Sequence, residues 1–344
     1  MQELAEFRVD ERFAPMLFAD GEGKRLGDSV RKVEIETNDP RLEKVGRLQS
    51  ELRAKQGKPF FYGWIVRRRY TKDELAAAAC FHLTISTVFE PPGESCGTKY
   101  DGSTVCPRCG AGAAQASDLR LDLRKVPKGK KIATTIADEI IVSQCLAERM
   151  TDAGLTGFEL RPVRHKARYE DDPLDLGQVP IGREMLKKAE VAGVTPGTGG
   201  FDVWLNREEN RSLLQQARAE SAALKGEESK RSGEPIPVWH QLVVPSNTAE
   251  IVAPTRVGID PFDDDPKGEC RCPMGDLIGL NLLTEVWISA ASRGEADIVC
   301  SRQFIGVRRG LLRPRRVILI SPKFRNLLES ESIKEGEIEI AHLV

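Results

Sequence analysis

The sequence predicts an α+β protein with mixed sheets and a zinc-knuckle hairpin. Segments such as VRKVEIET and HLTISTVFE alternate apolar and polar residues, as half-buried strands do. Helical patterns with capping residues lie between such segments. Three of the eight cysteines fall between Cys96 and Cys109, two of them in a Cys-Pro-Arg-Cys-Gly knuckle. These three observations together favour small sheets, short helices and a metal-bound turn.

Composition limits the class of protein. A chain of 344 residues predicts two domains or one large domain with insertions. The net charge of −1 argues against a wholesale nucleic-acid binder. No apolar run approaches the roughly 20 residues that span a bilayer, and the first residues include acids where a signal peptide needs a basic start. We therefore expect a cytoplasmic protein with no membrane partner. Because thiols stay reduced in the cytoplasm, closely spaced cysteines there are more often metal ligands or redox groups than disulfides.

The first 95 residues predict an α/β lead-in. VRKVEIET and FFYGWIVRRRY have strand character. Asn38 or Asp39 is placed to cap a helix through PRLEKVGRLQSELRAKQ. Thr71 and Glu74 form a capping-box pattern before KDELAAAACF. HLTISTVFE predicts a further strand, which a Pro-Pro-Gly sequence ends just before the cysteines.

A weak internal repeat organises the rest of the chain. Residues 139–163 and 317–344 each predict a β-branched strand that ends at a serine, Ser143 or Ser321, placed as a helix N-cap. A helix, a glycine-containing turn and an alternating strand follow. Each unit lies downstream of a cysteine pair. A structural duplication would give two related α/β halves; the alternative is chance recurrence of a common pattern.

These features divide the chain into four predicted parts. The lead-in covers 1–95, and the knuckle hairpin with its strand-helix-strand unit covers 96–163. A helical and loop insertion covers 164–237; it contains the helical pattern REENRSLLQQARAESAALK and the linker-like KGEESKRSGEPIP. The C-terminal α/β half, with the second cysteine turn, covers 238–344.

The knuckle has the chemistry of a zinc site. Two thiolates two residues apart can bind one tetrahedral ion, and zinc suits thiolate ligands. Cys96 is placed as a third ligand, facing Cys106 and Cys109 across a hairpin that turns at Asp101-Gly102. The alternatives are structural thiols and a redox pair. The third cysteine and the glycine after the knuckle argue against the redox pair.

The sequence leaves the fourth ligand open. His82 or Cys80 could reach back across the Pro-Pro turn, and Cys270 or Cys272 could complete the site across the fold. GECRCPMG keeps the proline and glycine of a knuckle but lacks its second cysteine in place. Of the remaining thiols, Cys145 is expected in the core and Cys300 in a buried strand.

No familiar catalytic motif is present. The sequence lacks HExxH, GxSxG and GxxxxGK[ST]. His165 lies in a charged loop, His240 in a predicted strand and His342 in the final strand. A zinc site with four cysteine or histidine ligands is closed to substrate and holds a hairpin together. His165 and His240 are the candidates for an enzyme with a cryptic site.

Three basic clusters could bind phosphate backbones. They are residues 67–69, 124–131 and 308–316. Solubility and ion pairing with the abundant acids are the alternative interpretation. The last cluster is the one to test for nucleic-acid binding, through Arg308, Arg309, Arg313, Arg315 and Arg316.

A family resemblance suggests a function. The CPRCG knuckle, the CPMG turn, the C-terminal GVRRGLLRPRRVILISPKFRNLLE and the unit DEIIVSQCLAERMTDAGLTGFELRPV resemble the myxobacterial double-CxxCG-motif proteins. These are classed as immunity proteins that neutralise a partner toxin. The resemblance covers about Cys96–Val163 and Cys270–Val344. It implies a non-enzymatic protein that contains Zn²⁺ and binds another protein. A zinc-ribbon protein that associates with nucleic acid is the first alternative, and an enzyme with a cryptic site is the second.

Overall fold

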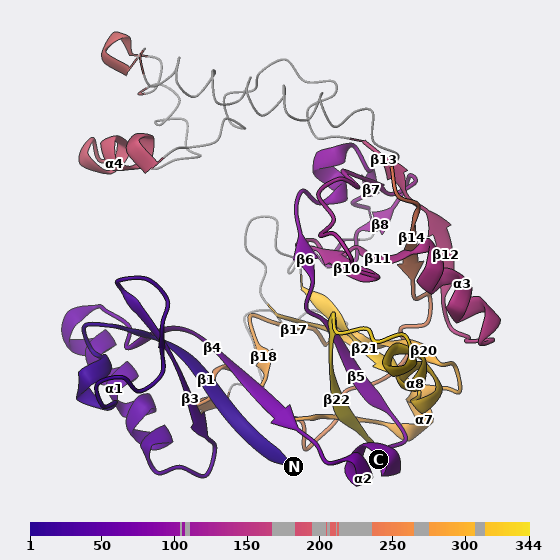
Figure 1. The fold of residues 1–344 in the computed structure, drawn as a ribbon, viewed down its shortest axis with the longest axis horizontal. Coiled ribbons are helices and arrows are strands. Elements are labelled where there is room, and N and C mark those ends of the chain that lie inside the picture. The colour runs from indigo at the N-terminus through magenta and orange to yellow at the C-terminus, as the bar shows by residue number, and fades with distance from the viewer. Residues whose placement is uncertain are drawn as a thin grey trace.

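The computed structural model describes residues 1–103, 105–106, 111–166, 183–194, 204, 207–210, 212, 236–264, 275–306 and 314–344. Within these ranges, helices and mixed sheets confirm the predicted α+β class. Figure 1 shows an N-terminal unit, drawn in indigo, to one side of two larger sheets. No described helix is long and apolar enough to cross a membrane.

The N-terminal unit is an antiparallel sheet packed against one long helix. Its strand order is β2-β3-β1-β4. Phe7, Ile35 and Phe61 of the sheet share a core with Val45 and Leu52 of the helix, which follows from the apolar spacing of both elements. The strands predicted at VRKVEIET and FFYGWIVRRRY and the helix between them are confirmed. Their bounds are β1 Gln2–Asp10, β2 Lys24–Arg25, β3 Val30–Glu36, α1 Arg41–Gln56 and β4 Phe61–Arg69, with a 3-10 turn, η1, at Ala14–Met16.

Local capping signals decide where the first helices begin. The N-cap of α1 is Pro40, one residue beyond the predicted Asn38 or Asp39, and the Asp39 carboxylate accepts a hydrogen bond from the Arg41 amide at 2.8 Å. The capping box before α2 (Lys72–Ala77) is present: Thr71 Oγ1 accepts from the Glu74 amide, and the Glu74 carboxylate accepts from the Thr71 amide at 2.8 Å. These bonds satisfy amides that a helix start leaves without partners.

The chain then enters two larger sheets. The segment HLTISTVFE, predicted as one strand, forms β5 (Phe81–Ile85) and β6 (Val88–Phe89), which belong to different sheets. The five-stranded order is β12-β14-β11-β10-β6, and the six-stranded order is β17-β20-β21-β5-β22-β19. The other bounds are β10 Ile132–Thr135, β11 Ile140–Ser143, α3 Gln144–Asp152, β12 Glu159–Pro162, β14 Trp239–Val243, β17 Leu277–Ile278, β19 Val286–Ile288, α7 Ala290–Arg293, β20 Ile298–Gly306, β21 Arg315–Ile320, α8 Pro322–Ser330 and β22 Gly336–Leu343.

Smaller elements connect these sheets. Three small sheets pair β7 with β8, β9 with β13, and β15 with β16 and β18. The helix predicted over 207–225 lies largely outside the described residues. The bounds are η2 Gly93–Cys96, β7 Tyr100–Asp101, β8 Ala114–Gln115, β9 Arg120–Leu121, β13 Arg164–His165, α4 Arg183–Val191, η4 Glu208–Asn210, β15 Val257–Asp260, β16 Asp263–Asp264 and β18 Asn281–Leu282.

The two predicted repeat units have the same local structure. β11-α3-β12 and β21-α8-β22 each contain a strand, a nine-residue helix and a strand. Ser143 Oγ accepts from the Leu146 amide at 3.3 Å, and Ser321 Oγ accepts from the Phe324 amide at 3.2 Å. Both predicted N-caps are therefore confirmed. The two helices pack their apolar faces into one common core.

The strands around the two units also correspond in order and direction. A third strand lies between the two strands of each unit and runs antiparallel to both: β14 in the first and β5 in the second. Val142 pairs with His240, as Ile320 pairs with Phe81. β10 precedes the first unit as β20 precedes the second, each antiparallel to the next strand. This agreement supports the duplication.

The two halves exchange their central strands. β5 precedes the first unit in sequence but lies in the sheet of the second. β14 precedes the second unit but lies in the sheet of the first. The Cys80 carbonyl accepts from the Ala341 amide at 3.0 Å, and the Trp239 carbonyl accepts from the Val163 amide at 3.2 Å. These matching bonds lie beside the exchanged strands. The predicted boundary at residue 95 falls after β5 and β6, and the four-part division stays a prediction.

Contacts from the C-terminal half hold the N-terminal unit. Arg68 of β4 has a buried guanidinium that bonds Glu3 within the unit at 2.7 Å and Glu339 of β22 at 3.1 Å. Arg68 Nη2 also donates to the Leu283 carbonyl at 2.8 Å. Phe262, after β15, stacks on Phe7 with ring centroids 5.9 Å apart.

Candidate metal centre

Cys96 ends a short 3-10 helix, η2, and its side chain is buried. Gly97 follows with φ of 88°, a left-handed conformation that glycine adopts without a Cβ penalty. The Gly97 amide donates to the Glu94 carbonyl at 3.2 Å, and the Thr98 amide donates to the Gly93 carbonyl at 2.8 Å. The backbone therefore forms a tight turn at the position predicted for a third ligand.

Cys106 lies on the cysteine hairpin, which we define as residues 99–116. β7 and β8 pair within it, and the Val105 amide donates to the Gly102 carbonyl at 3.1 Å. Asp101 therefore lies within β7, which pairs with residues 114–115, and the tight hairpin turn predicted at Asp101-Gly102 is wrong. The Cys106 amide donates to the Ala111 carbonyl at 2.9 Å. Cys109 itself lies outside the described residues.

The cysteine hairpin contacts the chain just after the second cysteine turn. Buried Cys106 packs in one cluster with Ala111 and Ile278 of β17. Cys270 and Cys272 lie outside the described residues. Fully extended, the chain from Cys272 to Ile278 spans no more than about 20 Å. The chain length is therefore compatible with Cys270 or Cys272 as the fourth ligand.

A buried carboxylate that sequence reasoning did not single out holds the first turn. Glu139 accepts from the Gly93 amide through both oxygens, at 3.0 and 3.1 Å. It also accepts from the Tyr100 hydroxyl at 2.5 Å and from the Thr135 hydroxyl. These bonds join the residues on both sides of Cys96 to the start of β11. Nothing in the local sequence pattern pairs Glu139 with residues 39 or more positions away.

His82 lies elsewhere, in the middle of the six-stranded sheet. Its Nε2 is 3.3 Å from Thr84 Oγ1, and its Nδ1 is 3.9 Å from a Glu339 oxygen. In the part of the chain that the structure describes, no group of three metal-ligating side chains occurs. His82, Cys96 and Cys106 therefore do not form such a group. Cys106 packs in one cluster with Ile278, which follows Cys270 and Cys272 in the sequence, so these two cysteines are the remaining candidates for the fourth ligand.

The other thiols lie apart from these turns. Cys80 is buried, and its sulfur accepts from Arg293 Nε at 3.4 Å. Cys300 lies in β20, as predicted, and burial raises the pKa of its thiol to about 12. The core position predicted for Cys145 is wrong. α3 buries Leu146, Ala147 and Met150, and Cys145 points away from that face to solvent.

The other three histidines form hydrogen bonds with neighbouring backbone or side-chain groups. The side chain of His165, expected at the surface, is only 10% exposed; its Nδ1 accepts from the Leu123 amide at 3.2 Å. His240 lies on β14, as predicted, and bonds Gln144. His342 lies on β22 with its Nε2 2.8 Å from Glu285, and its ring stacks on Trp287.

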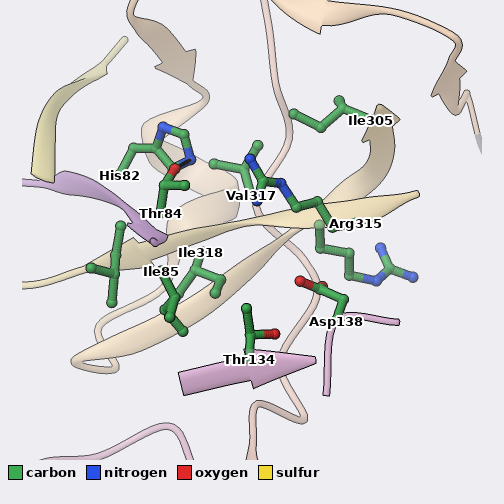
Figure 2. A pocket seen from close by; sticks show the side chains of 11 residues that line it. His82, Thr84, Ile85, Thr134, Asp138, Ile305, Arg315, Val317 and Ile318 are labelled. Carbon is green, nitrogen blue, oxygen red and sulfur yellow. Dashed lines mark hydrogen bonds between the residues drawn. The ribbon is translucent and has the colours of Figure 1, made fainter. Parts of the chain in front are cut away.

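A small, partly open cavity lies between the two large sheets. Figure 2 shows His82 and Thr84 together on one side of it, with Asp138 and Thr134 on another. Its volume of about 10 Å³ has room for about one water. Neither His165 nor His240 lines it. Asp138 has φ of 66°, and burial raises the pKa of its carboxyl to about 6. The cavity has no room for a substrate.

Of the basic cluster at 308–316, proposed to bind nucleic acid, the structure describes only residues 314–316. Arg308, Arg309 and Arg313 lie outside the described residues. Arg315 is exposed. Arg316 lies over the Phe304 ring, 4.0 Å from its centroid, and donates to the Ser301 carbonyl at 2.8 Å. Burial lowers the pKa of Arg316.

Side chains of the other basic clusters form ion pairs. Arg67 pairs with Glu337, and Arg68 pairs with Glu3 and Glu339. Lys131 bonds Glu331 at 3.0 Å, and Lys130 lies 3.9 Å from Glu335. The ion-pairing interpretation therefore holds for these four side chains.

Comparison of the chain with protein-family models, curated proteins and solved structures found no match. The interpretation of the site therefore depends on its residues and their geometry. The buried thiols of Cys96 and Cys106 are side chains of the type that zinc binds.

Proposed function

We propose that this chain is a zinc-stabilised, non-enzymatic protein-binding protein that neutralises a partner toxin. Cys96, Cys106 and Cys109 would hold the ion, together with Cys270 or Cys272. Bound zinc would supply folding free energy by joining the cysteine hairpin to the segment before β17. The packing of buried Cys106 in one cluster with Ala111 and Ile278 is the observation that supports this proposal.

The partner class comes from the resemblance in the two cysteine turns and the C-terminal region. Two features of the structure favour protein binding over the alternatives. Arginine and lysine side chains of two basic clusters pair with carboxylates, which leaves them less available to phosphates. The cavity between the sheets has room for about one water, and neither it nor the larger surface pockets of about 320–450 Å³ found among the described residues are lined by His165 or His240, which disfavours a cryptic enzyme site at these histidines.

Metal analysis tests the zinc site. Purified protein should contain about one zinc per chain by mass spectrometry. Cys106→Ser should remove most of it, because a tetrahedral site with three thiolates binds far more weakly. Cys145→Ser is the matched control, since this thiol is exposed on α3 away from the proposed ligands. Wild-type protein without metal would overturn the zinc site.

Co-expression tests the partner. The toxin-like product of an adjacent reading frame should co-purify with this chain as a stable complex and lose its toxicity. Failure to bind any neighbouring product would contradict the proposed role. Salt-dependent retention of nucleic acid on a filter, weakened by Arg315→Gln, would instead favour the nucleic-acid alternative.

A further inference from the structure

We propose that Glu139 is a positioning residue for the proposed zinc site, holding the backbone on both sides of Cys96 in its ligand-ready turn. The inference rests on the proposed function, because it assigns Cys96 as a ligand. Glu139 itself does not contact the ion in this proposal. Its role is to fix the direction of the Cys96 side chain before the metal binds.

The contacts of Glu139 bracket Cys96. Both carboxylate oxygens accept from the Gly93 amide, at the first residue of η2. The Tyr100 hydroxyl donates to Oε1 from the first strand of the cysteine hairpin at 2.5 Å. Cys96 lies between these two attachment points. A buried acceptor of this kind fixes the turn because its bonds hold the Gly93 amide and the Tyr100 hydroxyl in place, and the loss of a buried partner costs about 1–3 kcal/mol.

The Glu139 carboxylate lies close to the backbone of Gly93. A Cβ added at Gly93 would lie 2.7 Å from Glu139 Oε1 and 2.7 Å from Thr98 Oγ1. A side chain at this position would push against the carboxylate that accepts from the amide. The glycine of the Pro-Pro-Gly sequence therefore serves the contact with Glu139 as well as the end of the preceding strand.

The second half of the molecule provides an internal comparison. The Glu139 amide donates to Thr135 Oγ1 at 3.3 Å, and the Val317 amide donates to Ser301 Oγ at 2.8 Å, at the corresponding place between β20 and β21. Val317 is buried and apolar. The shared architecture thus accepts valine where the first half has a carboxylate. Of the two halves, only the first, which contains the CPRCG knuckle, has a carboxylate at this position.

Two variants of Glu139 test the inference in the full chain. Glu139→Val installs the residue of the other half, and Glu139→Gln keeps the shape but loses an acceptor. Zinc affinity is measured by competition with a chromophoric chelator, and Co²⁺ absorption reports the thiolate ligands. Each variant should lose roughly 10- to 100-fold in affinity. Hydrogen exchange of the metal-free protein should also show faster exchange over residues 93–101.

Val317→Ala is the matched control. It truncates a buried side chain at the corresponding position and should lower stability, yet leave zinc affinity within about twofold of wild type. Zinc affinity of Glu139→Val equal to that of this control would overturn the positioning role, with the zinc site intact. Wild-type protein that binds neither Zn²⁺ nor Co²⁺ would overturn the proposed function and this inference together.

Discussion

The ring of Phe262 lies against Gly46 in the middle of α1. A Cβ added to Gly46 would come within 2.8 Å of Cδ1 and Cγ of that ring. Glycine in a helix interior costs about 1 kcal/mol relative to alanine. Glycine at position 46 leaves room for the Phe262 ring to pack closely on the helix. The same ring stacks on Phe7 and so anchors the β15–β16 segment on the N-terminal unit.

The first prediction is a coupling between these two positions. Gly46→Ala in wild-type protein should fail to stabilise, because the clash with Phe262 offsets the gain in helix propensity. In a Phe262→Ala background, the same substitution should raise the free energy of unfolding by about 1 kcal/mol. Urea denaturation of the four proteins in this cycle measures the coupling. Equal effects of Gly46→Ala in both backgrounds would contradict the packing explanation.

The second prediction concerns pH and Asp138. Burial raises the pKa of this carboxyl to about 6 in the folded protein, above its ordinary value of 3.8. The folded state therefore binds more protons between about pH 4 and 6, and this group makes the free energy of unfolding fall as pH rises through that window. Asn tolerates the left-handed backbone at this position.

Asp138→Asn should accordingly remove this fall in the free energy of unfolding between pH 4 and 6. At pH 7.5 the variant should exceed wild type by on the order of 1–3 kcal/mol in free energy of unfolding, and at pH 4 the two should agree. Chemical denaturation at both pH values makes the comparison. A variant less stable than wild type at pH 7.5 would show that the charged carboxylate is stabilising.

A third prediction concerns the attachment of the N-terminal unit. The Arg68 guanidinium is 3% exposed and bonds Glu3, Glu339 and the Leu283 carbonyl. Arg68→Met should cost about 3 kcal/mol, because it removes a buried cation that bonds two partly buried carboxylates and a backbone carbonyl at once. Arg69→Met, at the exposed end of β4, should change stability by less than about 0.5 kcal/mol. Equal losses from the two substitutions in thermal denaturation would refute this assignment.

The fourth prediction compares the two helix caps. Ser143→Ala should cost about 1 kcal/mol, as the loss of an N-cap does. Ser321→Ala should cost more, because its hydroxyl also donates to Asp297 Oδ1 at 2.6 Å. Urea denaturation of both variants gives the difference. The order of the two costs is the test, and a larger loss from Ser143→Ala would count against it.

Local signals in the sequence predicted local structure well. The capping box at Thr71, the two serine caps and the burial of Cys300 all follow from patterns within a few residues. Pairing between distant strands does not follow from such patterns. The segment HLTISTVFE shows this, because its alternation is right for a strand and says nothing about two different sheets.

The site shows the same division between local and distant information. Cysteine spacing predicted a tight turn at Cys96-Gly97, which the structure has. Glu139 was missed, because its bonds to Gly93 and Tyr100 depend on the fold that brings them together. Cys145 was misplaced, because helical spacing alone did not decide which residues of α3 form its buried face.

The exchange of β5 and β14 has a consequence for synthesis on the ribosome. Leu83 of β5 pairs with Ile318 and Ile338, so this strand emerges long before its partners are translated. Until then its edges are open to pairing with other chains. Contacts between residues so far apart also slow folding. The nascent chain therefore has to keep an apolar strand from aggregating until the last helix and strand have been made.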